Sequence, residues 1–122
     1  IKWNPDTEVE DLSLLDIGIM PLFDSEWERG KCGLKILQYM GIGIPAVASP
    51  VGVNKDIIID QVNGFLPNSI EEWVEVLSLL IKNPSLRERI GAQGRKTVES
   101  SYSAKIISNK LLKLIQSMEK AR

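Results

Sequence analysis

The sequence contains no histidine and only one cysteine, Cys32. The lack of histidine excludes Ser-His-Asp and Cys-His nucleophile systems, and it excludes any metal site that needs a histidine ligand. A single cysteine excludes an internal disulfide and favours a reducing compartment. No apolar run approaches the roughly 20 residues that span a bilayer, and no signal-peptide pattern opens the chain. We therefore expect a soluble, cytoplasmic protein without a metal site.

The sequence also lacks an excess of charge of either sign. Its 15 basic and 16 acidic residues give a net charge of -1, so no overall positive field exists to hold a nucleic-acid backbone. An anion must therefore be bound locally. The 43% apolar content of the 122 residues is ordinary for one hydrophobic core, and we find no repeat or internal linker. We expect residues 1–122 to form a single domain.

Short apolar segments alternate with capped helical segments along the chain. Buried strands are predicted at residues 16–21, 46–48 and 65–66. Residues with N-cap chemistry precede the helical patterns, and they are Thr7, Asn54, Ser69, Ser85 and Ser103. This alternation predicts an α/β fold in which a Rossmann-like parallel sheet is flanked by helices. In such a sheet the loops that follow the strands meet at one edge, so residues 22–33 and 49–54 should frame the binding site.

The segment that begins the helix at residues 33–40 has the chemistry of an anion site. It comprises Gly30, Lys31, Cys32, Gly33, Leu34 and Lys35. Glycines allow close approach of the backbone to a ligand, and the free N–H groups of a first helical turn favour a phosphate. Lys31, Lys35 and Gln38 fall within about 60° of one another on a helical wheel, whereas Ile36, Leu37 and Met40 lie opposite. We expect the first face to contact the ligand and the second to pack on the sheet.

Other interpretations of these residues stay open. The lysines fit a solvated helix face and the glycines a plain turn, because short Gly-x-x-Gly spacing is a weak signal. Cys32 lacks a histidine base that would make it a nucleophile. Glu26 and Glu28 are the candidates for acid/base catalysis, although a solvated acidic loop explains them better. Trp73 is expected in the core, because it lies on an apolar stripe with Val76, Leu77, Leu80 and Ile81.

Several segments in one order carry a family resemblance. They read DIGIMPL at 16–22, GKCGLKILQYM at 30–40, GIPAVAS at 43–49, VGVN at 51–54 and NGFL at 63–66. This order resembles the C-terminal, nucleotide-sugar-binding domain of family 4 glycosyltransferases, a part of the glycosyl transferases group 1, which have the GT-B fold. The resemblance continues to Arg95 and covers nearly the whole chain.

The resemblance implies a retaining glycosyltransferase. Such an enzyme transfers a sugar from a nucleotide-sugar donor, here a UDP- or GDP-sugar, to a glycan, glycolipid or other glycoconjugate, with no metal or other cofactor. An N-terminal domain that this chain lacks would supply the acceptor side, and the full-length enzyme could associate peripherally with a membrane. The alternative is a non-catalytic α/β module that binds a nucleotide or a protein.

Two positions depart from the family pattern. The resemblance implies two glutamates in this segment, one near the donor sugar and one that accepts hydrogen bonds from the ribose diol. Aligned on Gly33 and Leu34, those positions are Gly30 and Gln38. The side-chain carbonyl of Gln38 can still accept one hydrogen bond, but it lacks the charge and the second oxygen of a carboxylate. This departure supports the non-catalytic alternative.

The chain begins at Ile1 rather than methionine, and we expect it to be a fragment of a longer protein. The resemblance implies about three earlier strands, one of which would pair with the strand at 17–20. Without that neighbour the strand has an open edge, which promotes pairing with another chain. The resemblance also implies that the helix at 104–118 exposes leucine and isoleucine, since it would pack toward the other domain. We therefore expect the fragment to form a homodimer.

Overall fold

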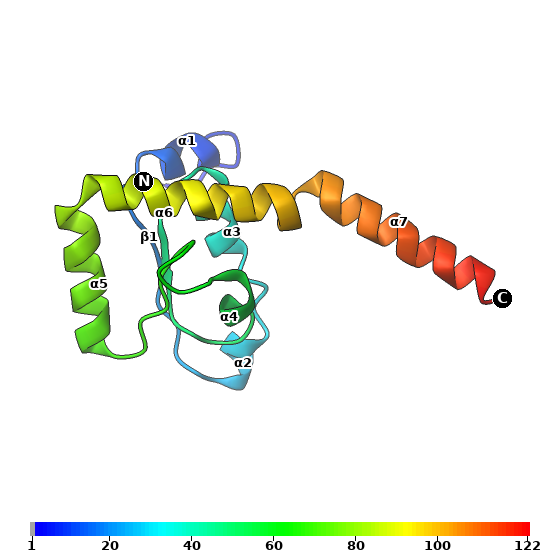
Figure 1. Cartoon of the computed structure of the whole chain (residues 1–122), viewed down its shortest axis with the longest axis horizontal. Coiled ribbons are helices and arrows are strands. Elements are labelled where there is room, and N and C mark those ends of the chain that lie inside the picture. The colour runs from blue at the N-terminus through cyan, green and yellow to red at the C-terminus, as the bar shows by residue number, and fades with distance from the viewer. Residues whose placement is uncertain (1) are drawn as a thin grey trace.

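Two short parallel strands lie at the centre of the computed structural model, which describes residues 2–122 (Figure 1). Strand β1, Gly18–Met20, pairs with β2, Ala46–Ala48, so that Ile19 lies opposite Val47. A parallel bridge from Val47 to Phe65 adds one further residue to the sheet. The strand predicted at 65–66 is thus reduced to this bridge.

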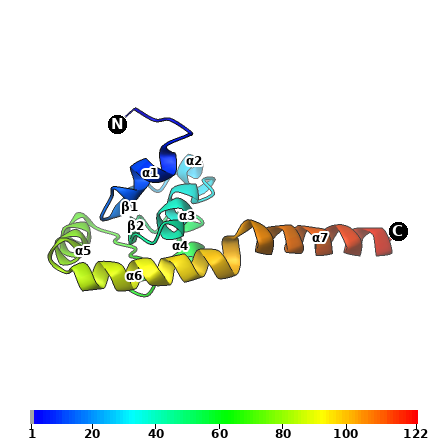
Figure 2. The ribbon, with the colours of Figure 1, turned by 90° about the horizontal axis from the view of Figure 1, so that it is seen from above.

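The helices alternate with the strands and then complete the chain. They are α1 Glu8–Ser13, α2 Glu26–Arg29, α3 Leu34–Gly41, α4 Asn54–Ile57, α5 Ile70–Lys82, α6 Pro84–Thr97, the π-helical turn η1 Val98–Tyr102, and α7 Ala104–Lys120. Helices α5 and α6 run in clearly different directions, and α7 extends away from the rest of the chain (Figures 1 and 2). The mixed helical and parallel-strand architecture confirms the predicted α/β class.

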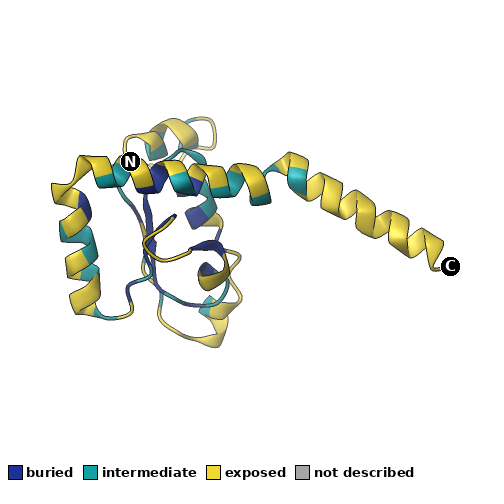
Figure 3. Ribbon diagram, viewed as in Figure 1, coloured by how far each residue is buried: buried dark blue, intermediate teal, exposed yellow. Residues whose placement is uncertain are grey.

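The two faces of β2 build two separate parts of the core. Successive side chains of a strand point to opposite faces. Ala46 and Ala48 accordingly pack in one cluster with Ile36 and Met40 of α3. Val47 packs in a second cluster with Phe65, Leu80 and Ile90, the last two from α5 and α6. In Figure 3 the buried residues gather at the strands and in the middle of α6.

Strand β1 is not buried on both faces, contrary to the prediction for residues 16–21. Its Ile19 side chain is 48% exposed, because the second cluster reaches only the partly buried Ile17 on that face. The Tyr39 hydroxyl donates a hydrogen bond to the Ile19 carbonyl over 3.3 Å. Burial raises the pKa of the Tyr39 phenol, which keeps this donor protonated.

Two of the predicted helix caps are confirmed. The hydroxyl oxygen of Ser69 accepts a hydrogen bond from the Glu72 N–H at 3.2 Å, and that of Ser103 accepts one from the Ile106 N–H at 3.4 Å. The cap predicted at Ser85 is wrong. The N-cap lies two residues earlier, at Asn83, whose side chain accepts a hydrogen bond from the Leu86 N–H at 3.0 Å, and helix α6 begins at Pro84. Proline suits the first helical position because its missing N–H would have no partner there.

Thr7 takes the predicted N-cap position of α1, but its side chain makes no cap hydrogen bond and instead donates its hydroxyl to the Asp11 carboxylate over 3.0 Å. The cap predicted at Asn54 is wrong. Asn54 lies inside α4, where it is 1% exposed, and its side-chain amide donates to the Ser49 carbonyl over 2.9 Å. A residue with cap chemistry here donates instead to a carbonyl five residues earlier in the chain.

Helix α5 has two apolar stripes rather than one. Trp73, Val76 and Leu80 pack in the second cluster. The expectation that Ile81 shares this buried stripe is wrong, because Ile81 is 66% exposed. It belongs to a second stripe at helical spacing with Ile70, Val74 and Leu77. Of these, Ile70 and Val74 are 79% and 59% exposed.

Helix α6 crosses the turn after α3 at very short range. A Cβ placed at Gly91 would lie 1.9 Å from the Gly43 carbonyl oxygen, so only glycine permits this crossing. The guanidinium of Arg95, one turn further along α6, donates a hydrogen bond to the Gly41 carbonyl. These contacts hold α6 against the C-terminal end of α3.

Helix α7 has no buried residue, and the prediction that it exposes leucine and isoleucine is confirmed. It follows Ser103, whose extended backbone (φ -66°, ψ 152°) redirects the chain after η1. No helix within residues 2–122 combines the length and the apolar character needed to cross a membrane.

We predict that Gly91→Ala lowers the free energy of unfolding by about 1–3 kcal/mol, the usual cost of overpacking, although alanine favours a helix over glycine by about 1 kcal/mol. Gly41→Ala is the matched control, because a Cβ there meets no atom within 4 Å. The control should be neutral or slightly stabilising in urea titrations followed by circular dichroism. Equal stability of the two variants would contradict the close crossing.

Candidate functional site

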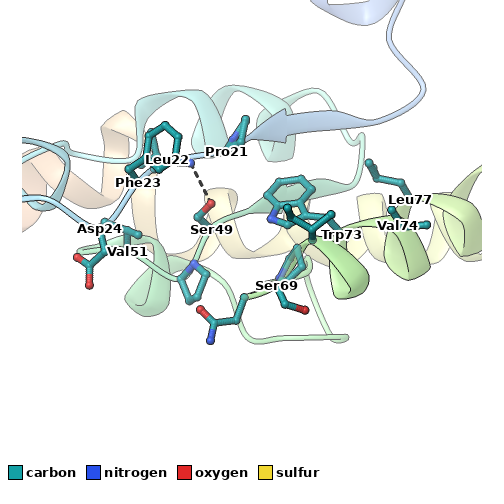
Figure 4. Close-up of a pocket in the computed structure, with 14 residues that line it drawn as sticks. Pro21, Leu22, Phe23, Asp24, Ser49, Val51, Ser69, Trp73, Val74 and Leu77 are labelled. Carbon is teal, nitrogen blue, oxygen red and sulfur yellow. Dashed lines mark hydrogen bonds between the residues drawn. The ribbon is translucent and has the colours of Figure 1, made fainter.

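The two loops at the carboxyl ends of β1 and β2 lie side by side, held by Ser49. The Ser49 N–H donates to the Met20 carbonyl at 3.2 Å, and the Ser49 hydroxyl oxygen accepts from the Leu22 N–H at 2.9 Å. Figure 4 shows the second of these hydrogen bonds. Ser49 is 8% exposed, and its carbonyl accepts the side-chain amide of Asn54. Ser49 and Asn54 therefore hold the two loops in position.

A cavity of about 390 Å³ lies at the start of α3, lined by Met20 and by all six residues predicted to bind an anion, Gly30 to Lys35. Gly33 precedes α3 with a left-handed backbone (φ +69°), a conformation that glycine adopts without strain. Within residues 2–122, the backbone N–H groups of Leu34, Lys35 and Ile36 meet no acceptor. The cavity therefore offers unpaired donors at the positive end of a helix dipole.

The two lysines of this segment differ in their partners. Lys31 Nζ lies 2.6 Å from Glu28 Oε2. This separation makes the contact an ion pair. Lys35 is exposed, lines the cavity and forms no ion pair with any described residue. Lys35 is thus the cation whose charge is available to a ligand.

Gln38 does not line the cavity. Its side-chain amide donates to Glu8 Oε1 of α1 over 3.2 Å, and the indole N–H of Trp3 donates to the same oxygen over 3.3 Å. The structure therefore brings Lys31 and Lys35 to the predicted site, while Gln38 ties α3 to the N-terminal segment.

The candidate acids of the loop lie on α2, beside the cavity. Glu26 is exposed, and Glu28 is half-buried and engaged with Lys31. Near them Arg29 Nε lies 2.6 Å from Asp24 Oδ1, and this hydrogen bond lowers the pKa of Asp24. Cys32 is a free, exposed thiol.

A larger groove of about 670 Å³ runs between the loop after β1 and helix α5. Trp73, Val74 and Leu77 line it from α5, opposite Pro21 and Leu22 (Figure 4). The sequence placed Trp73 in the core, whereas it is half-buried and shared between the core and this groove. The sequence signal that could have revealed this groove is the second apolar stripe of α5, because a helix that packs on one core needs only one apolar stripe.

The pattern of the family described as glycosyl transferases group 1 matches residues 5–97. The chain belongs to this family. Among curated group 1 relatives, the sucrose synthase of Thermosynechococcus vestitus is 35% identical over 88 residues, which are 67% of this chain and 11% of that enzyme. The chain thus spans about a tenth of that relative's length.

Two solved structures share the fold. The C-terminal domain of the group 1 glycosyltransferase LpcC from Francisella tularensis matches with a TM-score of 0.70 and 25% identity, over 85% of this chain and 53% of that domain. Sucrose-phosphate synthase from Thermosynechococcus elongatus matches with a TM-score of 0.79 over 92% of this chain and 27% of that enzyme. At 20% identity the second likeness shows the fold alone. The group 1 resemblance and the GT-B C-terminal fold are thus confirmed, whereas the assignment to family 4 stays a prediction.

Proposed function

We propose that the chain is the donor-binding part of a retaining glycosyltransferase of family 4. The donor is a UDP- or GDP-sugar, and the acceptor is a glycan, a glycolipid or another glycoconjugate. Besides membership of the group 1 family, the observation that supports this best is the cavity at the start of α3. There the unpaired backbone N–H groups of α3 and the unpaired Lys35 meet in one place.

In this proposal the donor diphosphate lies over the start of α3. The helix dipole favours the anion by about 0.3–1 kcal/mol, and a charge-assisted hydrogen bond from Lys35 adds about 1.5–3 kcal/mol. Charge on the diphosphate grows as the sugar departs, so a fixed cation stabilises the transition state more than the bound donor. Lys31 contributes less, because Glu28 already compensates its charge.

The proposed enzyme contains more of the donor-binding domain and an N-terminal domain. The chain matches only 53% of the LpcC C-terminal domain. It also leaves uncovered the Ile19 face of β1 and the second stripe of α5, which flanks the groove. We propose that earlier strands and helices of the full-length protein cover these apolar surfaces. The full-length enzyme is proposed to be cytoplasmic and peripherally associated with a membrane.

A second candidate is a non-catalytic nucleotide- or protein-binding α/β module. It is favoured by Gly30, which stands at the position where the resemblance implies a glutamate near the donor sugar. Nucleotide binding survives this change more easily than catalysis does, because the diphosphate contacts use other residues. Sugar transfer by the full-length protein separates the two candidates, and its absence despite nucleotide binding would favour the module.

We predict that UDP or GDP perturbs the backbone amide signals of residues 30–36 in NMR titrations, while those of α7 stay unchanged. The isolated chain should bind with a Kd near 1 mM, or about 4 kcal/mol, because half of the cleft is missing. Lys35→Ala should raise Kd about tenfold through loss of a charge-assisted hydrogen bond.

Lys31→Ala is the matched control for this titration, since it removes an identical side chain whose charge is already paired. It should change Kd by clearly less than Lys35→Ala. Perturbations confined to other surfaces, or an equal loss from both lysines, would refute the assignment of the diphosphate to this cavity.

In the full-length protein, we predict that Lys35→Ala lowers kcat more than Gln38→Ala does. Lys35 meets charge that develops during reaction, whereas Gln38 is engaged by Glu8 outside the cavity. Gln38→Ala should instead lower thermal stability, by weakening the contact between α3 and α1. Comparable kcat losses, or a larger loss from Gln38→Ala, would contradict this division of roles.

We also propose that the isolated chain forms a homodimer along the outer edge of β1, without transferase activity of its own. Exposed strand edges pair with other chains, and a charge placed on the edge prevents this. Sedimentation at micromolar concentration should show a dimer that Ile19→Lys dissociates and Phe23→Lys, beyond the strand, does not. A monomer before any substitution, or sugar transfer by the isolated chain, would overturn this proposal.

A further inference from the structure

Helix α2 is held in place beside the cavity at the start of α3. The Glu28 N–H donates a hydrogen bond to the Ser25 hydroxyl oxygen at 3.3 Å and so caps the helix. At its other end α2 packs closely against the loop after β2, because a Cβ at Gly52 would lie 2.8 Å from the Arg29 carbonyl oxygen. The Glu28 side chain therefore starts from a fixed backbone position.

The ion pair between Glu28 and Lys31 is partly shielded from water. The Glu28 side chain is 21% exposed and the Lys31 side chain 43%. The Glu28 Oε2 atom, which lies 2.6 Å from Lys31 Nζ, is inaccessible to solvent. Removing the cation would leave this carboxylate oxygen buried and unpaired, which is costly for a charged group. Glu28 therefore holds the Lys31 ammonium more firmly than an exposed carboxylate would.

Lys31 is at the same time part of the cavity lining. Among residues 2–122, the cavity is lined by two lysines, Lys31 and Lys35, and by no carboxylate. Glu28 is not one of the lining residues, so it acts on a ligand only through Lys31. An anion in the cavity and the Glu28 carboxylate are therefore alternative partners for one ammonium group.

We propose that Glu28 lowers the affinity of this cavity for a nucleoside diphosphate by competing with its phosphates for Lys31. The inference rests on the function proposed above, in which the diphosphate lies over the start of α3. Glu28 is then a positioning residue, because it contacts Lys31 and not the ligand. Any attraction that Lys31 gains from a phosphate is offset by the buried carboxylate oxygen that the ammonium leaves behind.

The competition matters most after sugar transfer. When the bond from the sugar to the diphosphate breaks, the bonding electrons stay on the diphosphate oxygen, the acceptor oxygen takes its place on the sugar, and the acceptor proton passes to solvent. The nucleoside diphosphate thereby gains one negative charge, and a second free lysine would hold it more tightly than the donor. Because product release limits turnover in many enzymes, a paired Lys31 favours release of the nucleoside diphosphate.

The test is the Kd of UDP for the 122-residue chain, measured from the backbone amide signals of residues 30–36. Glu28→Gln keeps the shape of the side chain and should lower Kd about threefold, the scale expected for one partly exposed ion pair. Glu26→Gln is the matched control, because it removes the same charge from the same helix. Glu26 is exposed and forms no ion pair with any residue in the range 2–122, so its substitution should change Kd clearly less.

A double substitution identifies Lys31 as the residue through which Glu28 acts. Lys31→Ala should raise Kd about threefold more in the Glu28→Gln chain than in the unsubstituted chain, because only there is its ammonium free for the ligand. A purely structural role for Glu28 would leave the effect of Lys31→Ala the same in both chains.

The outcomes separate this inference from the proposed function. If UDP perturbs residues 30–36 but Glu28→Gln does not lower Kd, or Glu26→Gln lowers it equally, or the effects of Glu28→Gln and Lys31→Ala are additive, the role of Glu28 is overturned and the donor site stands. If UDP perturbs none of these residues, both are overturned.

Discussion

Ser49 holds the two loops of the candidate site together through its N–H, carbonyl and hydroxyl groups. Its partners are Met20 and Leu22 from the exit of β1 and Asn54 from α4. A buried polar group left without a partner costs about 1–3 kcal/mol, so these bonds specify the loop positions strongly. Both the cavity at the start of α3 and the groove beside α5 depend on this arrangement, because the chain that leaves β1 lines each of them.

The electrostatics of the cavity depend on which lysine has a partner. On a helical wheel Lys31 and Lys35 share one face and look equivalent. The structure makes them different, because Glu28 lies three residues before Lys31 and pairs with it. An anion at the start of α3 therefore meets one uncompensated ammonium group and a row of backbone donors, not two equal lysines. Such a site orients a phosphate by geometry more than by charge.

Local signals predicted those parts of the structure that local chemistry decides. Ser69 and Ser103 cap their helices as expected, and the segment from Gly30 to Lys35 gathers around one cavity. The failures arise where another hydrogen-bond partner competes for the same group. Asn54 has cap chemistry, but the buried Ser49 carbonyl takes its amide.

Gln38 lies outside the cavity because of a contact with a distant segment of the chain. Helical spacing places its Cα on the lysine face, yet its side chain turns to Glu8, which lies 30 residues earlier in the sequence. Helical spacing predicts on which side of a helix a residue lies. It does not show which residue of a distant segment the side chain contacts. The sequence therefore could not predict this contact between residues that lie far apart in the chain.

The charge distribution shows how a net charge can conceal a locally basic segment. A net charge of -1 correctly indicates that the chain has no overall positive field. Salt at physiological concentration screens the interaction between exposed charges beyond about 8 Å. A surface close to one part of the chain therefore does not experience the net charge of the whole chain. Because α7 stands apart from the rest of the chain, the charge of +4 on residues 104–122, from five basic residues and one acidic residue, acts locally and is not cancelled by the acidic remainder.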